Sequence, residues 1–118
     1  MKILVIGSGD KKRISQSQLK EIAAGFGNFV KAIVDIKKGI MAIGGELHAD
    51  EEALLLEKGS QQRYLWGINL YPDLQGKDFI EFDSVINLRP AHGNRSRGVD
   101  DAQIRQEIRE IVNNLILP

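Results

Sequence analysis

Two helix-start patterns, one near each end of the chain, constrain the fold most strongly. Ser15 and Gln18 form a capping box, and Asp100 and Gln103 repeat the same pattern. In each case apolar residues follow at helical spacing, and a further apolar residue stands just before the cap. The sequence therefore predicts one helix that ends near Gly27 and another that starts at Asp100 and closes the chain.

Stretches rich in β-branched residues lie before and between these helices. They predict strands at 1–6, 29–36, 40–44, 65–71 and 79–88, separated by glycine and proline turns. Asp50 is predicted to cap a short second helix, with Glu51 and Glu52 in its first turn and Gly59 after its end.

The resulting order is β-α-β-β-α-β-β-α, which indicates an α+β (α/β) fold. We expect a single globular domain over residues 1–118, with a mixed sheet and helices mainly on one face. The chain has no internal repeat and no linker-like segment, and 118 residues are enough to bury a core.

The composition excludes several classes of protein. Sixteen Lys and Arg balance sixteen Asp and Glu, which disfavours bulk duplex nucleic acid as a partner, since its binding needs a basic surplus. The absence of Cys excludes disulfides, thiolate catalysis and zinc ribbons. No apolar run reaches the ~20 residues of a membrane span, and the first residues are typical of a strand. We therefore predict a cytoplasmic protein with no membrane partner.

A glycine-containing turn, Gly7-Ser8-Gly9, follows the first predicted strand, as in dinucleotide-binding proteins. Lys12 occupies the third glycine position, and several residues separate this turn from the helix cap at Ser15. The chain also lacks the Gly-Lys-Ser/Thr of a P-loop. The sequence therefore predicts neither kind of nucleotide site, and no cofactor.

The segment 44–52, GGELHADEE, combines one histidine with four carboxylates. Imidazole and carboxylate suit several divalent ions, so a metal-dependent hydrolase centred on Glu46, His48 and Asp50 is one hypothesis. Helix capping and the helix dipole explain the acids from 50 to 52 better than a metal does, and the second histidine of an HExxH motif is missing. Capping leaves Glu46 and His48 unexplained, and no metal ligand is assigned.

The segment 89–98, RPAHGNRSRG, carries three arginines and one histidine but no acid. Arginine matches phosphate or carboxylate with a planar fork, and glycine lets backbone amides approach an anion. An exposed loop whose arginines pair with nearby acids explains the pattern equally well. The predicted ligand-binding residues are Arg89, Asn94, Arg95, Ser96 and Arg97.

Both segments follow a predicted strand, and each offers one histidine. If they meet, His48 and His92 could exchange protons while Arg95 or Arg97 holds a phosphate and Glu46 orients an imidazole. The predicted catalytic residues are therefore Glu46, His48 and His92, for phosphoester chemistry without a metal. Whether the segments meet depends on strand directions that the sequence does not define.

Short motifs of a recognisable kind cover nearly the whole chain. They are VDI at 34–36, GIMAIGGELHADEE at 39–52, EKGS at 57–60, LWGIN at 65–69, NLRP at 87–90 and GNRSR at 93–97. With these motifs the chain resembles a family of short bacterial proteins described only as a domain of unknown function. The resemblance implies a free-standing bacterial cytosolic protein, and it implies no activity.

Three functions follow from these patterns. The first, which the sequence favours, is a site on the arginine segment for a phosphate-bearing ligand, either a nucleotide or a nucleic acid, with or without histidine-based phosphoester chemistry. The second is the metal-dependent hydrolase at the GGELHAD segment. The third is a non-enzymatic protein that forms a homo-oligomer or binds a partner through its arginines, which are enriched at interfaces.

Overall fold

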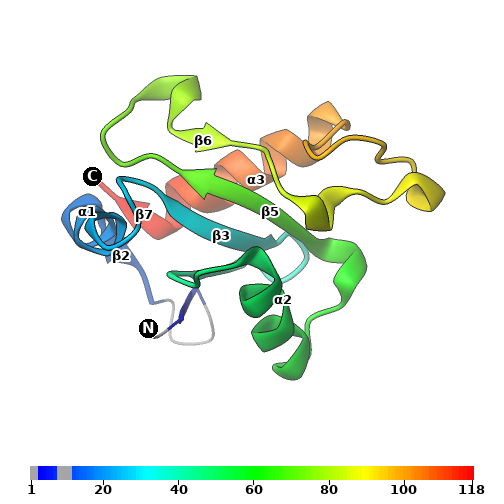
Figure 1. Ribbon diagram of the computed structural model, residues 1–118, viewed down its shortest axis with the longest axis horizontal. Helices are drawn as coiled ribbons and strands as arrows, with labels where there is room; N and C mark the ends of the chain where they lie inside the picture. The colour runs from blue at the N-terminus through cyan, green and yellow to red at the C-terminus, as the bar shows by residue number, and fades with distance from the viewer. Residues whose placement is uncertain (1–2, 8–11) are drawn as a thin grey trace.

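The main sheet is built around the hairpin of the second and third predicted strands (Figure 1). The computed structural model describes residues 3–7 and 12–118. Within these residues the sheet has the order β1-β4-β3-β5-β6, and every neighbouring pair is antiparallel. Its strands are β1 (Leu4–Ile6), β3 (Val30–Asp35), β4 (Ile40–Ile43), β5 (Leu65–Leu70) and β6 (Ile80–Glu81).

A parallel pair of short strands lies apart from the main sheet. β2 (Ile14–Ser15) pairs with β7 (Ile116–Leu117), and the pair joins the start of α1 (Gln16–Ala24) to the end of α3 (Ala102–Leu115). The sequence predicts neither strand, because two residues are too few to show an alternating pattern. The α+β class is confirmed, with the antiparallel and parallel strands divided between two sheets.

Alternation along β3 separates the two faces of the main sheet. Ala32 and Val34 belong to a larger core that includes side chains of α1 and α3, whereas Ile33 belongs to a smaller core. The smaller core is covered by α2 (His48–Glu57) through Leu55. Figure 1 shows α2 in front of the sheet and α3 behind it, and α1 packs with α3 on the larger core, so two of the three described helices share one face.

The first helix begins as predicted, but the second begins earlier. Ser15 caps α1, and its side chain and that of Gln18 complete the capping box. α2 starts at His48 with Leu47 as its N-cap, so the prediction that Asp50 caps this helix is wrong. The Asp50 N–H already bonds to the Leu47 carbonyl, which closes the first turn.

The third helix begins one residue later than predicted. Its N-cap is Asp101, whose side chain accepts from the Gln103 N–H at 2.8 Å. The predicted cap, Asp100, is occupied elsewhere, because its carboxylate accepts hydrogen bonds from the Arg95 N–H and the Ser96 hydroxyl. Two adjacent aspartates offered the same capping chemistry, and the preceding loop decides between them.

The predicted strand at 79–88 is wrong beyond Glu81. The reason lies at the free edge of β5, where the Asn87 side chain accepts from the Gly67 N–H at 2.8 Å and donates to the Gly67 carbonyl at 2.9 Å. This side chain thus takes the place of a paired strand. A Cβ at Gly67 would lie 2.5 Å from the Ser84 Cβ, so the close approach requires glycine. Short 3₁₀ helices occupy Gln62–Tyr64 (η1), Gly76–Asp78 (η2), Val85–Asn87 (η3) and Pro90–His92 (η4).

Some predictions fall on residues that the structure does not describe. They concern Met1 and Lys2 of the first predicted strand and Ser8 and Gly9 of the glycine turn. In the described part of the chain, no helix has the length and apolar character needed to cross a membrane.

Candidate functional site

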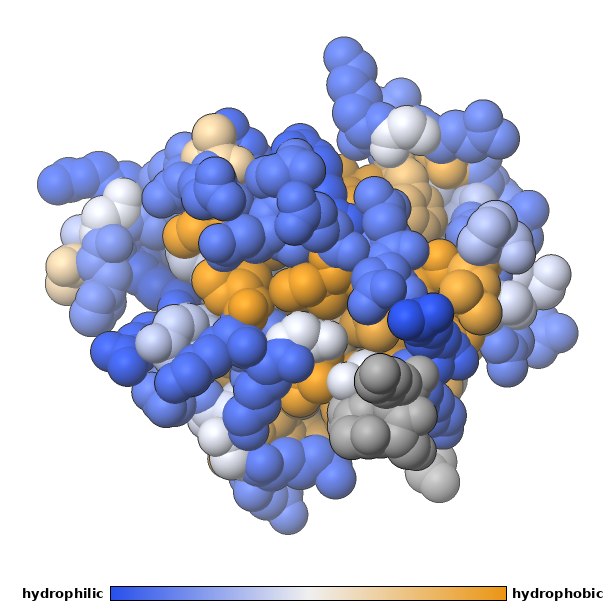
Figure 2. All heavy atoms as spheres, turned by 180° about the vertical axis from the view of Figure 1, so that it is seen from behind, coloured by the Kyte–Doolittle hydropathy of each residue, from blue (hydrophilic) through white to orange (hydrophobic). Residues whose placement is uncertain are grey.

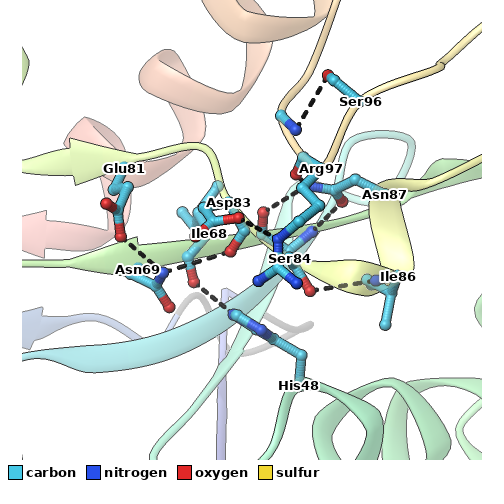
Figure 3. Close-up of polar contacts among 12 residues, drawn as sticks. His48, Ile68, Asn69, Glu81, Asp83, Ser84, Ile86, Asn87, Ser96 and Arg97 are labelled. Carbon is cyan, nitrogen blue, oxygen red and sulfur yellow. Dashed lines mark hydrogen bonds and ion pairs between the residues drawn. The ribbon is translucent and has the colours of Figure 1, made fainter.

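His48 lies in the first turn of α2 with its ring against β5 (Figure 3). Its Nε2 is 2.8 Å from the carbonyl oxygen of Ile68. A carbonyl only accepts, so Nε2 carries the hydrogen and the neutral ring keeps its lone pair on Nδ1. Burial lowers the pKa of His48 below 6.5, and the bond to the Ile68 carbonyl opposes this only in part. His48 is therefore a neutral imidazole with a basic Nδ1 at pH 7.

The charged side chains that act on the His48 imidazole come from three other elements. They are Lys31 of β3, Asp83 after β6, and Arg97 of the arginine segment. The Arg97 Nε donates to Asp83 Oδ1 at 2.7 Å, and the two side chains are 53% and 42% exposed. Figure 3 shows His48 and this ion pair approaching the same stretch of β5. His48 of segment 44–52 and Arg97 of segment 89–98 are therefore close enough for their charges to interact.

A hydrogen-bonded group extends from this ion pair along the edge of the sheet. The Asn69 amide nitrogen donates to Glu81 Oε1 at 2.9 Å and lies 3.3 Å from the Asp83 carbonyl. The Tyr71 hydroxyl donates to the same Glu81 oxygen at 2.9 Å, and burial together with Glu81 raises the pKa of Tyr71. Among the described residues, nothing donates to the buried Asn69 Oδ1. A buried acceptor without a donor is energetically costly.

These side chains occupy the half of the sheet surface that α2 leaves open. The register of β3, β5 and β6 places Lys31, Asn69 and Glu81 in one row across the strands. By alternation this row is on the same side as Ile33 of the smaller core. We call this surface the polar face; it consists of Lys31, His48, Asn69, Glu81, Asp83 and Arg97.

Glu51, one turn after His48, is fully buried beneath α2. Its Oε2 accepts from the Gly45 N–H at 2.9 Å, and its Oε1 has no partner among the described residues. Burial raises the pKa of Glu51 to about 9, so the carboxyl is neutral at pH 7. A Cβ at Gly45 would lie 2.8 Å from the Glu51 Cγ, which explains why a glycine faces this carboxyl.

Two of the predicted ligand-binding residues are instead committed to the fold. The first is Arg89, whose guanidinium donates to the carbonyls of Arg63 and Leu65 and lies 4.3 Å from the centre of the Trp66 ring. Burial lowers the pKa of this guanidinium. Arg89 therefore holds the start of β5 to the segment that follows η3.

Asn94 is the second such residue, and it organises the loop from within. Its buried amide nitrogen donates to the carbonyls of Asn87, Ser96 and Gly98, at 2.8, 3.1 and 2.8 Å. Its Oδ1 accepts from the Asp100 N–H at 2.8 Å. These bonds fix the backbone that carries Arg95 and Arg97.

The remaining members of the arginine segment are exposed. The Ser96 hydroxyl donates to Asp100 at 2.5 Å, and this bond and the Arg95 N–H hold the pKa of Asp100 below its ordinary value. The Arg95 side chain has no partner in the described part of the chain. His92 lies exposed in η4, at the tip of the short loop closed by the Arg89–Asn94 bridge. The structure thus brings His48 to Arg97 and leaves His92 and Arg95 at the outside of the segment.

The second hypothesis requires ligands around Glu46, His48 and Asp50. Glu46 and Asp50 are exposed, and His48 is directed toward β5. Within residues 3–7 and 12–118, no three His, Asp or Glu side chains are grouped so that they could hold a metal ion. The geometry therefore gives no support to a metal centre in the 44–52 segment.

Comparison with known protein families matches residues 10–115 to the family described as "Protein of unknown function (DUF5674)". The chain belongs to this family. Comparison with curated proteins and with solved structures gives no match. The DUF5674 description assigns no activity, so the function has to be inferred from the geometry of the polar face.

Four members of the polar face of this DUF5674 protein were not among the predicted site residues, namely Lys31, Asn69, Glu81 and Asp83. Lys31 and Asn69 are polar residues inside otherwise apolar strands, and that interruption of the pattern is the sequence feature that marks them. Glu81 and Asp83 both fall in the segment predicted as a longer strand, 79–88. Glu51 carries no such mark, because an acid in the first turn of a helix is ordinarily explained by the helix dipole.

Proposed function

We propose that this protein binds a phosphate-bearing ligand on the polar face and that His48 accepts a proton there. The observation that carries the proposal is a neutral imidazole beside two cations, Lys31 and Arg97, on an accessible part of the sheet. Cations stabilise phosphate oxygens, and a neutral histidine supplies a base at neutral pH.

Arg97 is the cation with the best geometry for phosphate. It pairs with Asp83 through Nε, which leaves its two terminal nitrogens for a bidentate contact. Asp83 keeps the guanidinium oriented without covering it, since Arg97 remains 53% exposed. Arg95, two residues earlier and exposed, adds a positive charge at the rim.

Asn69 and His48 give the ligand an orientation. The Asn69 Oδ1 is buried and lacks a donor among the described residues, so a side-chain movement that uncovered it would let it accept from a hydroxyl or amino group of the ligand. A hydroxyl or water beside His48 Nδ1 would pass its proton to the imidazole and attack phosphorus. The P–O bond to the leaving group would break, and the imidazolium would return the proton to the departing oxygen or to solvent. Because the pKa of His48 is lowered, this base stays active below pH 6.5 and is lost as the pH falls through its pKa in the folded protein.

Imidazole NMR signals test binding with a built-in control, because the chain contains two histidines. Titration with inorganic phosphate, AMP and a short oligonucleotide should shift the signals of His48 and leave those of His92 in place. Arg97→Gln should weaken binding about tenfold, the effect of losing a charge-assisted hydrogen bond. Lys58→Gln, which removes an exposed cation at the other end of α2, should have no effect. A shift confined to His92, or unchanged affinity in Arg97→Gln, contradicts the proposal.

The proton-accepting role is tested separately from binding. His48→Gln keeps a hydrogen-bond donor for the Ile68 carbonyl but removes the base, so it should bind AMP and fail to hydrolyse bis(p-nitrophenyl) phosphate. His92→Gln is the matched control and should retain the wild-type rate. Equal rates of hydrolysis in the two variants would show that His48 is not the proton acceptor.

A second candidate function, self-association, is favoured by apolar side chains beside Arg89. Val85 is 61% exposed and Leu88 is 43% exposed, on either side of Ile86, which packs against the smaller core. Exposed apolar side chains beside an arginine are typical of interfaces. Light scattering should show a dimer that dissociates in the double variant Val85→Ser, Leu88→Ser. A monomer at every concentration would exclude this function.

A further inference from the structure

A pocket lies on the other side of the main sheet, away from the polar face. It has a volume of about 830 Å³ and is bounded by α1, the connection between β5 and β6, and the end of α3. The view of this side in Figure 2 shows hydrophobic side chains in a band between hydrophilic ones. A pocket of this size suits a small organic ligand.

The inner surface of the pocket includes apolar side chains that also pack on the core. Phe79 and Ile80 line it and pack against the larger core, and Ile116 of β7 is 6% exposed. The Gln16 side chain donates to the Pro72 carbonyl at 2.9 Å, which ties the β5–β6 connection to α1. The pocket is therefore held together by contacts between elements that lie far apart in the sequence.

The charges around the pocket are unbalanced. Three cationic side chains line it, Lys20, Lys77 and Arg109, against a single acidic one, Asp73. Lys20 lies 3.8 Å from Asp73, and both are exposed. Lys77 and Arg109 make no ion pair in the described part of the chain, and the Arg109 guanidinium lies 5.2 Å from the centre of the Phe82 ring. Two cations therefore remain available beside an apolar surface.

We infer that this pocket binds a small amphipathic anion, with one carboxylate or phosphate group on an apolar body. Lys77 and Arg109 would neutralise the anionic group, and Phe79, Ile80 and Ile116 would contact the apolar body. Leu74, which is 47% exposed, lines the pocket and adds apolar surface at its edge. None of the residues that line this pocket belongs to the polar face.

Two dyes of similar shape allow the contributions of charge and of apolar contact to binding in the pocket to be measured separately. Anilinonaphthalene sulfonate is anionic, and N-phenylnaphthylamine is its uncharged analogue. The double variant Lys77→Gln, Arg109→Gln should bind the anionic dye about tenfold more weakly and the uncharged dye with unchanged affinity. Leu74→Ser should weaken the binding of both dyes. Circular dichroism checks that each variant keeps its secondary structure, and Lys58→Gln controls for the loss of a cation elsewhere.

Competition then identifies the anionic group. Displacement of the anionic dye by octanoate assigns a carboxylate, and displacement by octyl phosphate alone assigns a phosphate monoester. Absence of dye binding to the native protein, equal affinity in the double variant, or failure of both competitors overturns the inference. Arg97→Gln should leave dye binding unchanged, so the outcome here is independent of the function proposed for the polar face.

Discussion

The stability of the smaller core depends on the protonation of the Glu51 carboxyl. Its side chain is fully buried, and burial raises its pKa from 4.5 to about 9. Between these two values the unfolded chain releases a proton that the folded chain keeps. The contribution of Glu51 to stability is therefore complete below pH 4.5 and is lost as the pH rises toward about 9. The slope is at most about 1.4 kcal/mol for each pH unit.

Glu51→Gln should remove this dependence on pH. The amide stays neutral, so the free energy of unfolding at about pH 8 should rise by about 1–3 kcal/mol relative to the wild type. Urea unfolding at about pH 5 and about pH 8 measures the difference. Glu57→Gln, at the exposed end of α2, is the control and should behave as the wild type. If the free energy of unfolding of Glu51→Gln still falls between these two pH values, another group is responsible for the dependence on pH.

At the scale of an element, the segment from η3 to α3 owes its shape to side-chain amides. Asn87 replaces a strand at the edge of β5, and Asn94 holds the backbone on both sides of Arg95 and Arg97. This long irregular segment is rigid because its buried backbone groups are satisfied by these amides. Arg97 of the proposed site, and Arg95 at its rim, are thus presented on a loop held by side-chain hydrogen bonds.

Asn94→Ala should lower the free energy of unfolding by about 2–4 kcal/mol, because several backbone groups lose their partner at once. Arg95→Ala, one position away, removes only an exposed side chain and should change stability by less than about 0.5 kcal/mol. Thermal unfolding of the two variants makes the comparison. Equal stability of the two would show that the loop is held by other contacts.

Local interactions explain which elements could be predicted from the sequence. The Ser15 capping box and the β-branched runs of β3, β4 and β5 depend on neighbouring residues, and these elements were predicted nearly to their ends. The strand at 79–88 failed because Asn87 meets Gly67 across 20 positions. His48 and Arg97 were both candidates, but their proximity depends on how α2 and the arginine segment pack on β5, which no local pattern contains.

At the scale of the whole molecule, the two cores share the same strands. Adjacent residues of β3, Ile33 and Val34, belong to different cores, so neither core can lose its sheet surface without the other. We therefore expect one cooperative transition for the main sheet and its helices.

The single tryptophan of the chain makes this expectation testable. Trp66 is 5% exposed in the larger core, and its fluorescence should change together with the far-ultraviolet circular dichroism of the helices during urea unfolding. Arg89→Lys should shift the tryptophan emission, because the planar guanidinium over the ring is lost, while both signals still change together. Two separated midpoints in the wild type would show that the cores unfold independently.

The parallel pair of β2 and β7 has a consequence for synthesis of the chain. Ile14 leaves the ribosome early, but its partner Ile116 is translated after all the strands of the main sheet. Until α3 itself is synthesised, the apolar side of the sheet that it covers stays open to water. The nascent chain therefore exposes this surface until its last helix emerges. A ribosome that stalls before residue 116 holds a chain that cannot complete its larger core.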